Sequence, residues 1–190
     1  LVASGSRGGV SAFGLAALLL PVASGRRRST ALAVGLLATL GIAWIGLGDI
    51  VAAFETRGIQ GSRLDLWTDM LPMVPDFPVF GLGLNAFSSA YPFYQTVWRT
   101  EWIGEAHNEY LQVLLDLGIV GVVLVGALLV LVFRASWRNA SRGGLELGLF
   151  GALVALAVHN LVDFNWQIPA NAATWVALAA LALNARPRRV

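Results

Sequence analysis

Residues 105–134, EAHNEYLQVLLDLGIVGVVLVGALLVLVFR, decide the fold class of this chain. No charged side chain occurs between Asp116 and Arg134, an interval of 17 residues that is rich in leucine and valine. A helix needs about 17–25 such residues to cross the hydrocarbon core of a bilayer. The stretch therefore predicts a transmembrane helix over residues 112–133, preceded by a polar segment that contains a histidine.

The composition of the whole chain agrees with a membrane protein. Of its 190 residues, 57% are hydrophobic and 13% are charged, whereas soluble chains have about 45–50% and about 25%. A soluble chain of this size buries only about 70% of its surface. The composition therefore excludes a soluble enzyme, a disordered tail and a free nucleic-acid binder. The absence of cysteine excludes a disulfide framework, a thiol nucleophile and a cysteine metal site.

Four further uncharged runs have nearly the length of a membrane span. They contain 18, 20, 16 and 22 residues, and they predict helices over residues 8–25, 29–48, 146–162 and 168–185. We therefore expect an all-α fold, a polytopic membrane bundle of about five transmembrane helices.

The orientation of this bundle follows from three arginine clusters, at residues 26–28, 134–142 and 186–189. If each helix crosses once, all three clusters lie on one side of the membrane, and the positive-inside rule assigns that side to the cytoplasm. Residues 49–111 then form a large periplasmic loop. We expect the protein to be a multi-pass protein of the bacterial inner membrane whose active face is periplasmic.

A short interfacial helix is predicted in the loop, beginning near Ser62 and ending near Pro72. Its apolar side is expected to carry Leu64, Trp67, Met70 and Leu71, with Asp65 and Asp69 opposite. Two acids four residues apart could share a cation. No denser carboxylate cluster supports that site, so we expect no metal ion and no other cofactor.

The stretch FGLGLNAF (Phe80–Phe87) has glycines only at positions 81 and 83. A dinucleotide-binding loop needs a third glycine and a preceding strand, so a nucleotide site is the weaker interpretation. The stretch predicts a turn that leads into a short helix capped by Asn85.

Three side chains on the outer face are candidates for chemistry. His107 lies at the start of a long helix, where the helix dipole favours the neutral imidazole that can accept a proton; it could equally be a capping or interfacial residue. Arg7 and Arg63 carry guanidinium groups that suit a phosphate or pyrophosphate. The alternative for both arginines is contact with lipid headgroups.

Five stretches together resemble the O-antigen ligase and polymerase superfamily of bacterial envelope proteins. They are SGSRGG (4–9), SRLDLWTDMLPMVPDFPVFGLGLNAF (62–87), AYPFY (90–94), EAHNEYLQVLLDLGIVG (105–121) and HNLVDFNWQIPANA (159–172). The resemblance covers nearly the whole chain. It implies that residues 1–190 form the C-terminal part of one membrane domain of the GT-C type, because the full fold has roughly twice as many helices.

The resemblance also implies an activity and roles for the candidates. The family transfers a glycan from undecaprenyl pyrophosphate to an acceptor, which is lipid A–core or a growing glycan chain. By resemblance, Arg7 and Arg63 bind the leaving pyrophosphate and His107 assists the acceptor hydroxyl. Glu105, Asn108 and Asp163 are expected to support these groups.

Two other functions stay open from the sequence alone. A polysaccharide polymerase would differ only in its acceptor. A transporter or non-catalytic scaffold would be expected to carry charged or broken helices at mid-membrane. The central parts of most predicted spans are uncharged and the polar groups gather on the outer face, which favours an enzyme.

Overall fold

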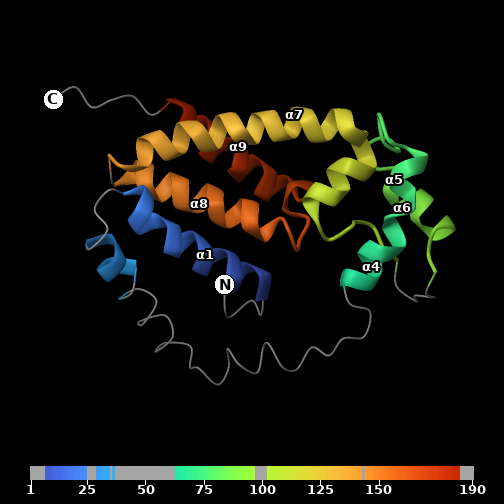
Figure 1. Ribbon diagram of the computed structural model, residues 1–190, viewed down its shortest axis with the longest axis horizontal. Helices are drawn as coiled ribbons and strands as arrows, with labels where there is room; N and C mark the ends of the chain where they lie inside the picture. Colours follow the sequence, from blue (N-terminus) through green and yellow to red (C-terminus); the bar gives the residue numbers. More distant parts are fainter. Residues whose placement is uncertain are drawn as a thin grey trace, which may run out of the picture. The chain divides into compact units, whose positions relative to one another are not determined.

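The computed structural model describes residues 7–24, 29–34, 36, 63–96, 102–142 and 144–184. Every regular element in these ranges is a helix, as predicted for an all-α fold. In chain order the elements are α1 (Arg7–Ala23), α4 (Arg63–Met70), α5 (Met73–Asp76), α6 (Phe87–Ala90), η1 (Tyr91–Phe93), α7 (Glu109–Ala140), α8 (Leu145–His159), η2 (Asn165–Gln167) and α9 (Pro169–Asn184) (Figure 1).

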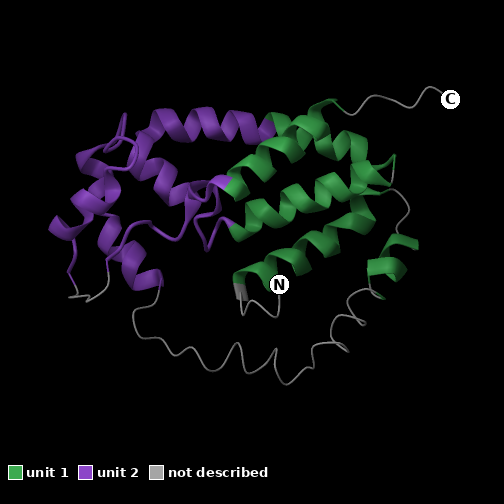
Figure 2. Ribbon diagram, turned by 180° about the vertical axis from the view of Figure 1, so that it is seen from behind, with its two compact units in different colours: residues 1–58, 131–159, 170–190 green, residues 59–130, 160–169 purple. Residues whose placement is uncertain are grey.

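The chain divides into two compact units (Figure 2). Unit 1 consists of Leu1–Gly58, Leu131–His159 and Ala170–Val190. Unit 2 consists of Ile59–Val130 and Asn160–Pro169. The second unit therefore holds most of the predicted periplasmic loop together with the turn between α8 and α9.

Within the described ranges, α7 is the one helix long and apolar enough to cross a membrane. Helices α1, α8 and α9 begin and end within three residues of the predicted spans 8–25, 146–162 and 168–185. Each of them is shorter than a helix needs to be to cross a membrane by the same criterion of length and apolar composition. Residues 29–34 and 36 are helical, and the rest of the predicted span 29–48 lies outside the described residues. The five-span bundle stays a prediction.

Unit 1 is held together by packing of α1 against α8. Ala16 and Ala23 of α1 share a buried cluster with Phe150 and Val154 of α8. A Cβ on Gly151 would come within 2.9 Å of a methyl group of Leu20, so glycine at this position allows the two helices to approach closely.

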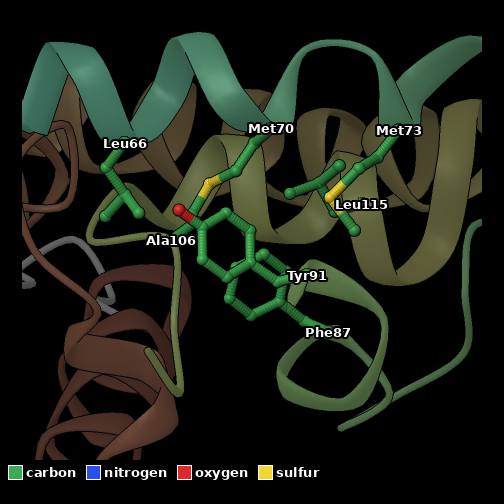
Figure 3. Packing of buried hydrophobic residues seen from close by; sticks show 7 residues of the cluster. All are labelled: Leu66, Met70, Met73, Phe87, Tyr91, Ala106 and Leu115. Carbon is green, nitrogen blue, oxygen red and sulfur yellow. The ribbon is translucent and has the colours of Figure 1, made fainter. Parts of the chain in front are cut away.

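Unit 2 has an apolar core of its own (Figure 3). Met70 and Met73 are fully buried, and the rings of Phe87 and Tyr91 stack with centroids 5.5 Å apart. The remaining members of the cluster are Leu66, Ala106 and Leu115. Removal of this apolar surface from water favours folding by about 25 cal/mol per Å². The core therefore joins α4, α6 and the start of α7 to the segment that precedes His107.

The predicted interfacial helix is present as α4, but its buried face differs from the predicted one. Leu64 and Leu71 are 67% and 58% exposed, whereas Asp69 is only 4% exposed. Asp69 can be buried because its carboxylate accepts hydrogen bonds from the hydroxyls of Tyr91, at 3.2 Å, and Thr96. The partners come from far along the chain, so helical spacing could not reveal them.

The stretch Phe80–Phe87 forms a turn followed by the short helix α6, in agreement with the prediction. The predicted cap by Asn85 is wrong, because Ala86 is the N-cap residue and no side chain caps the helix. Asn85 has a φ of 62°, in the left-handed region that asparagine tolerates better than most residues. Its contribution is therefore to the turn itself.

Helix α7 is broken at Gly118, where φ is 60° and ψ is −159° (Figure 1). The prediction of an uninterrupted helix over residues 112–133 is wrong at this point. A break leaves backbone N–H and C=O groups without helical partners, and here the loop 78–83 satisfies them. Four backbone hydrogen bonds join loop and helix: Leu82 N to Leu115 O (2.8 Å), Gly83 N to Asp116 O (2.9 Å), Ile119 N to Pro78 O (2.9 Å) and Val120 N to Val79 O (3.2 Å).

Candidate functional site

His107 lies in the turn that leads into α7, within unit 2. Its φ of 51° is in the left-handed region, which residues with a side chain rarely adopt. The next residue, Asn108, caps α7, because its Oδ1 accepts hydrogen bonds from the backbone N–H groups of Tyr110 and Leu111, both at 3.1 Å. The bend and the cap together hold the imidazole beside the start of the helix.

Residues 160–167, which we call the 160–167 turn, pack against this bend. The ring of Phe164 meets the ring of His107 edge to face, with centroids 4.9 Å apart and an interplanar angle of 75°. The backbone N–H of Glu109 donates to the carbonyl of Asn160 at 2.8 Å. Both contacts lie within unit 2, so the histidine bend and the 160–167 turn form one packed structure.

Helix α4 brings Arg63 to the same place. The guanidinium of Arg63 donates a hydrogen bond to the carbonyl of Val162, in the 160–167 turn. One helical turn later, the indole N–H of Trp67 donates to the carbonyl of Ala106 at 2.8 Å. Helix α4, which begins at Arg63, is therefore fixed to both segments that surround the imidazole.

The surroundings of His107 favour its neutral form. Burial lowers the pKa of His107 below its usual value of 6.5, and the positive charge of Arg63 lowers the pKa further. The carboxylates of Asp163 and Glu105 act in the opposite direction without reversing the shift. A neutral imidazole at neutral pH can accept a proton from a hydroxyl group.

The imidazole of His107 is only partly buried. Its Nδ1 is buried and has no hydrogen-bond partner among the described residues. A partly exposed imidazole that is held by ring packing suits the role of a general base.

The structure thus brings together five of the six predicted site residues. His107, Arg63, Asp163 and Glu105 interact electrostatically, and Asn108 holds the bend through its cap. Arg7 is the first residue of α1 in unit 1, and its side chain lies outside the described residues. Its role stays a prediction.

Sequence reasoning missed three groups that shape the site: the Phe164 ring, the Val162 carbonyl and the Glu109 carboxylate. Phe164 and Val162 flank Asp163, which the sequence did single out. A backbone carbonyl gives no sequence signal. Glu109 is an acid at the start of an apolar helix. Its complete burial depends on a partner segment more than 50 residues away, which the local sequence does not reveal.

A cation shared by Asp65 and Asp69 has little support in the structure. Asp65 is exposed, whereas Asp69 is buried against two hydroxyl groups. In the part of the chain that the structure describes, no group of three or more histidines and acids is arranged to hold a metal ion.

Comparison with known proteins gives matches over most of the chain. A family model described as O-antigen ligase matches residues 1–126. An O-antigen ligase of Pseudomonas aeruginosa is 28% identical over 176 residues, which is 92% of this chain and 41% of that protein. A ComP-specific O-oligosaccharyltransferase of Acinetobacter baylyi is 24% identical over 116 residues, which is 60% of this chain and 21% of that protein.

The chain therefore spans less than half the length of these curated relatives. No solved structure matches it.

Proposed function

The chain belongs to the O-antigen ligase family, and from this premise we propose that it takes part in moving a glycan from undecaprenyl pyrophosphate to an acceptor hydroxyl. The observation that carries the proposal is the half-buried imidazole of His107, whose pKa is lowered by burial and by the nearby guanidinium of Arg63. A transfer at an anomeric carbon needs a base for the acceptor and a stabilised diphosphate leaving group. These two side chains supply both.

In the proposed reaction, the neutral imidazole of His107 takes the proton of the acceptor hydroxyl as the hydroxyl oxygen attacks the anomeric carbon of the donor. A new glycosidic bond forms while the bond between that carbon and the pyrophosphate oxygen breaks. The electron pair of the broken bond leaves with undecaprenyl pyrophosphate. Arg63 and Arg7 bind the negative charge of this leaving group, and no metal ion takes part.

The remaining groups support the base. Asp163 and Glu105 place negative charge near the imidazole, which stabilises the imidazolium formed during transfer. Asn108 keeps His107 in its bend by capping α7.

The same proposal gives the chain a location. We place the reaction at the periplasmic face of the bacterial inner membrane, in a bundle of about five transmembrane helices. The arginine clusters at residues 26–28, 134–142 and 186–189 support this orientation, and the length of α7 supports a membrane crossing.

The test is the pool of lipid-linked glycan in cells that express the gene with His107→Ala. Accumulated polymer on the lipid carrier is expected if the protein is a ligase, and accumulated single repeats would instead identify a polymerase. An unchanged pool, with normal protein in the membrane, would remove the catalytic proposal. Thr68→Ala is a suitable control, because Thr68 is an exposed residue of α4 whose hydroxyl bonds only to its own helix, at the carbonyl of Leu64.

A further inference from the structure

Glu109 is a fully buried carboxylate that the proposed reaction does not use. Its Oε2 accepts a hydrogen bond from the backbone N–H of Trp166 at 2.9 Å, and its Oε1 accepts one from Nε2 of Gln167 at 2.8 Å. Both donors are neutral amides. Burial of a carboxylate that is held by neutral amides is costly, so this group is expected to have a role that offsets the cost.

The two amides identify what the carboxylate holds. Trp166 and Gln167 close the 160–167 turn, and the backbone N–H of Glu109 also holds its beginning through the carbonyl of Asn160. A further hydrogen bond, from Nδ2 of Asn165 to Oδ1 of Asn160 at 2.9 Å, closes the turn on itself. Glu109 therefore forms hydrogen bonds with both ends of the 160–167 turn.

The middle of that turn carries the groups that surround the proposed base. The Val162 carbonyl accepts the hydrogen bond of Arg63, Asp163 acts on the charge of His107, and the Phe164 ring packs against the imidazole. Glu109 is only two residues from His107 in the sequence. A movement of the turn would displace the imidazole and the guanidinium relative to each other.

We propose that Glu109 is a positioning residue, which locks the 160–167 turn so that the imidazole of His107 and the guanidinium of Arg63 keep a fixed separation. This inference rests on the proposed function, because it assigns Glu109 to the same reaction. It differs from a direct catalytic role, since the carboxylate is fully buried and its two hydrogen bonds go to the turn.

Glu109 acts in this way through geometry. The charges that act on His107 are those of Arg63, Asp163 and Glu105. Glu109 influences the base by holding the turn that carries Asp163 and Phe164. Loss of its hydrogen bonds should therefore slow transfer, and a replacement that keeps both hydrogen bonds should not.

The decisive experiment compares two replacements of Glu109. Glu109→Met has a similar volume but no carboxylate, so the Trp166 N–H and the Gln167 amide both lose their acceptor. In Glu109→Gln, the new amide oxygen can accept from the Trp166 N–H. The new N–H₂ can donate to the side-chain oxygen of Gln167, because the carboxamide of this exposed residue can rotate. Glu109→Gln therefore keeps both contacts without the charge.

The assay measures glycan transfer by the full-length gene product in membranes, at matched protein levels. A misplacement of about 1 Å can cost roughly a hundredfold in rate, so Glu109→Met is expected to lower kcat by about tenfold to a hundredfold. The KM for the lipid-linked donor should change little, because the arginines remain. Glu109→Gln should retain most of the wild-type rate.

Gln167→Ala provides a milder variant in which folding is not at risk, because Gln167 is exposed. It removes one of the two carboxylate contacts and should lower kcat less than Glu109→Met does. Two results would overturn the inference: normal transfer in both Glu109→Met and Gln167→Ala, or a Glu109→Gln variant that accumulates normally but is as slow as Glu109→Met. Failure of the proposed function itself would appear separately, as full activity in His107→Ala.

Discussion

Gly118 lies directly against the backbone of Gly81. A Cβ on Gly118 would come within 2.7 Å of the Gly81 nitrogen and 2.4 Å of the Val79 carbonyl. The relation is reciprocal, because a Cβ on Gly81 would lie 2.5 Å from the Leu117 nitrogen. Both glycines also have positive φ angles, 60° and 69°. The close approach of these two backbone segments therefore requires glycine at both positions.

Gly118→Ala should therefore destabilise unit 2. Strain at the positive φ and overpacking against Val79 together should cost about 2–5 kcal/mol. Thermal unfolding of the purified protein in detergent measures the effect. Gly126→Ala is the matched control in the same helix, since nothing lies within 4 Å of its added Cβ. Equal unfolding temperatures for the two variants would contradict the close contact between the backbones of Gly118 and Gly81.

The pH dependence of transfer should report the proton on His107. The neutral imidazole is the active form, and its pKa is lowered by burial and by Arg63. The rate should therefore fall only as the pH drops below about 6.5, the usual histidine value. Asp163→Asn removes a charge that raises this pKa, so the limb should move to lower pH. Arg63→Gln should move it to higher pH.

The opposite displacements are measured as the acidic midpoint of kcat against pH for each variant. If the acidic midpoints of both variants equal that of the wild type, His107 is not the titrating group.

Arg63→Lys distinguishes a pyrophosphate ligand from a headgroup contact. Lysine keeps the charge but lacks the planar fork that meets two oxygens at once. A substantial fall in transfer, of about tenfold, is expected if the guanidinium binds the leaving group. Arg134→Lys makes the same chemical change at an exposed position outside the site and should have little effect. Near-normal transfer by Arg63→Lys would favour the headgroup interpretation.

Orientation in the membrane can be read from two single cysteines, because the chain has none. Ser89 and Ser141 are both exposed, and the proposed topology assigns them to opposite sides of the membrane. In cells with a permeabilised outer membrane, an impermeant maleimide should label Ser89→Cys and not Ser141→Cys. The reverse pattern would invert the topology and remove the periplasmic site.

Transfer should survive an excess of EDTA. The arginines are proposed to carry the pyrophosphate charge that a divalent ion carries in other transferases. The measurement is the transfer rate in liposomes before and after chelation. Inactivation that a divalent ion reverses would contradict the metal-free reaction and direct attention to Asp65 and Asp69.

Local sequence patterns predicted the helices well and their long-range partners poorly. The uncharged run after Asp116 located α7, but the helix continues to Ala140 because arginines at its end are compatible with helical structure. The break at Gly118 was not predictable from this pattern. It depends on backbone groups of residues 78–83, whose approach leaves no periodic signal.

The same limit applies to the site. The residue types at His107 and Arg63 suggested the roles proposed for them, and the structure places both around one turn. The buried side of α4 was predicted wrongly because hydroxyl groups from a distant segment satisfy Asp69. Polar burial depends on such partners, and helical spacing does not encode them.

The break in α7 also has a consequence for the proposed membrane crossing. Between Gly118 and Arg134, the first arginine of the proposed cytoplasmic cluster, lie 15 uncharged residues. They rise about 22 Å at 1.5 Å per residue, which is less than a hydrocarbon layer of about 30 Å. In the proposed topology the break would therefore lie inside the outer part of that layer, where lipid offers no hydrogen bonds. Loop 78–83 would there supply the backbone partners that water supplies at a protein surface.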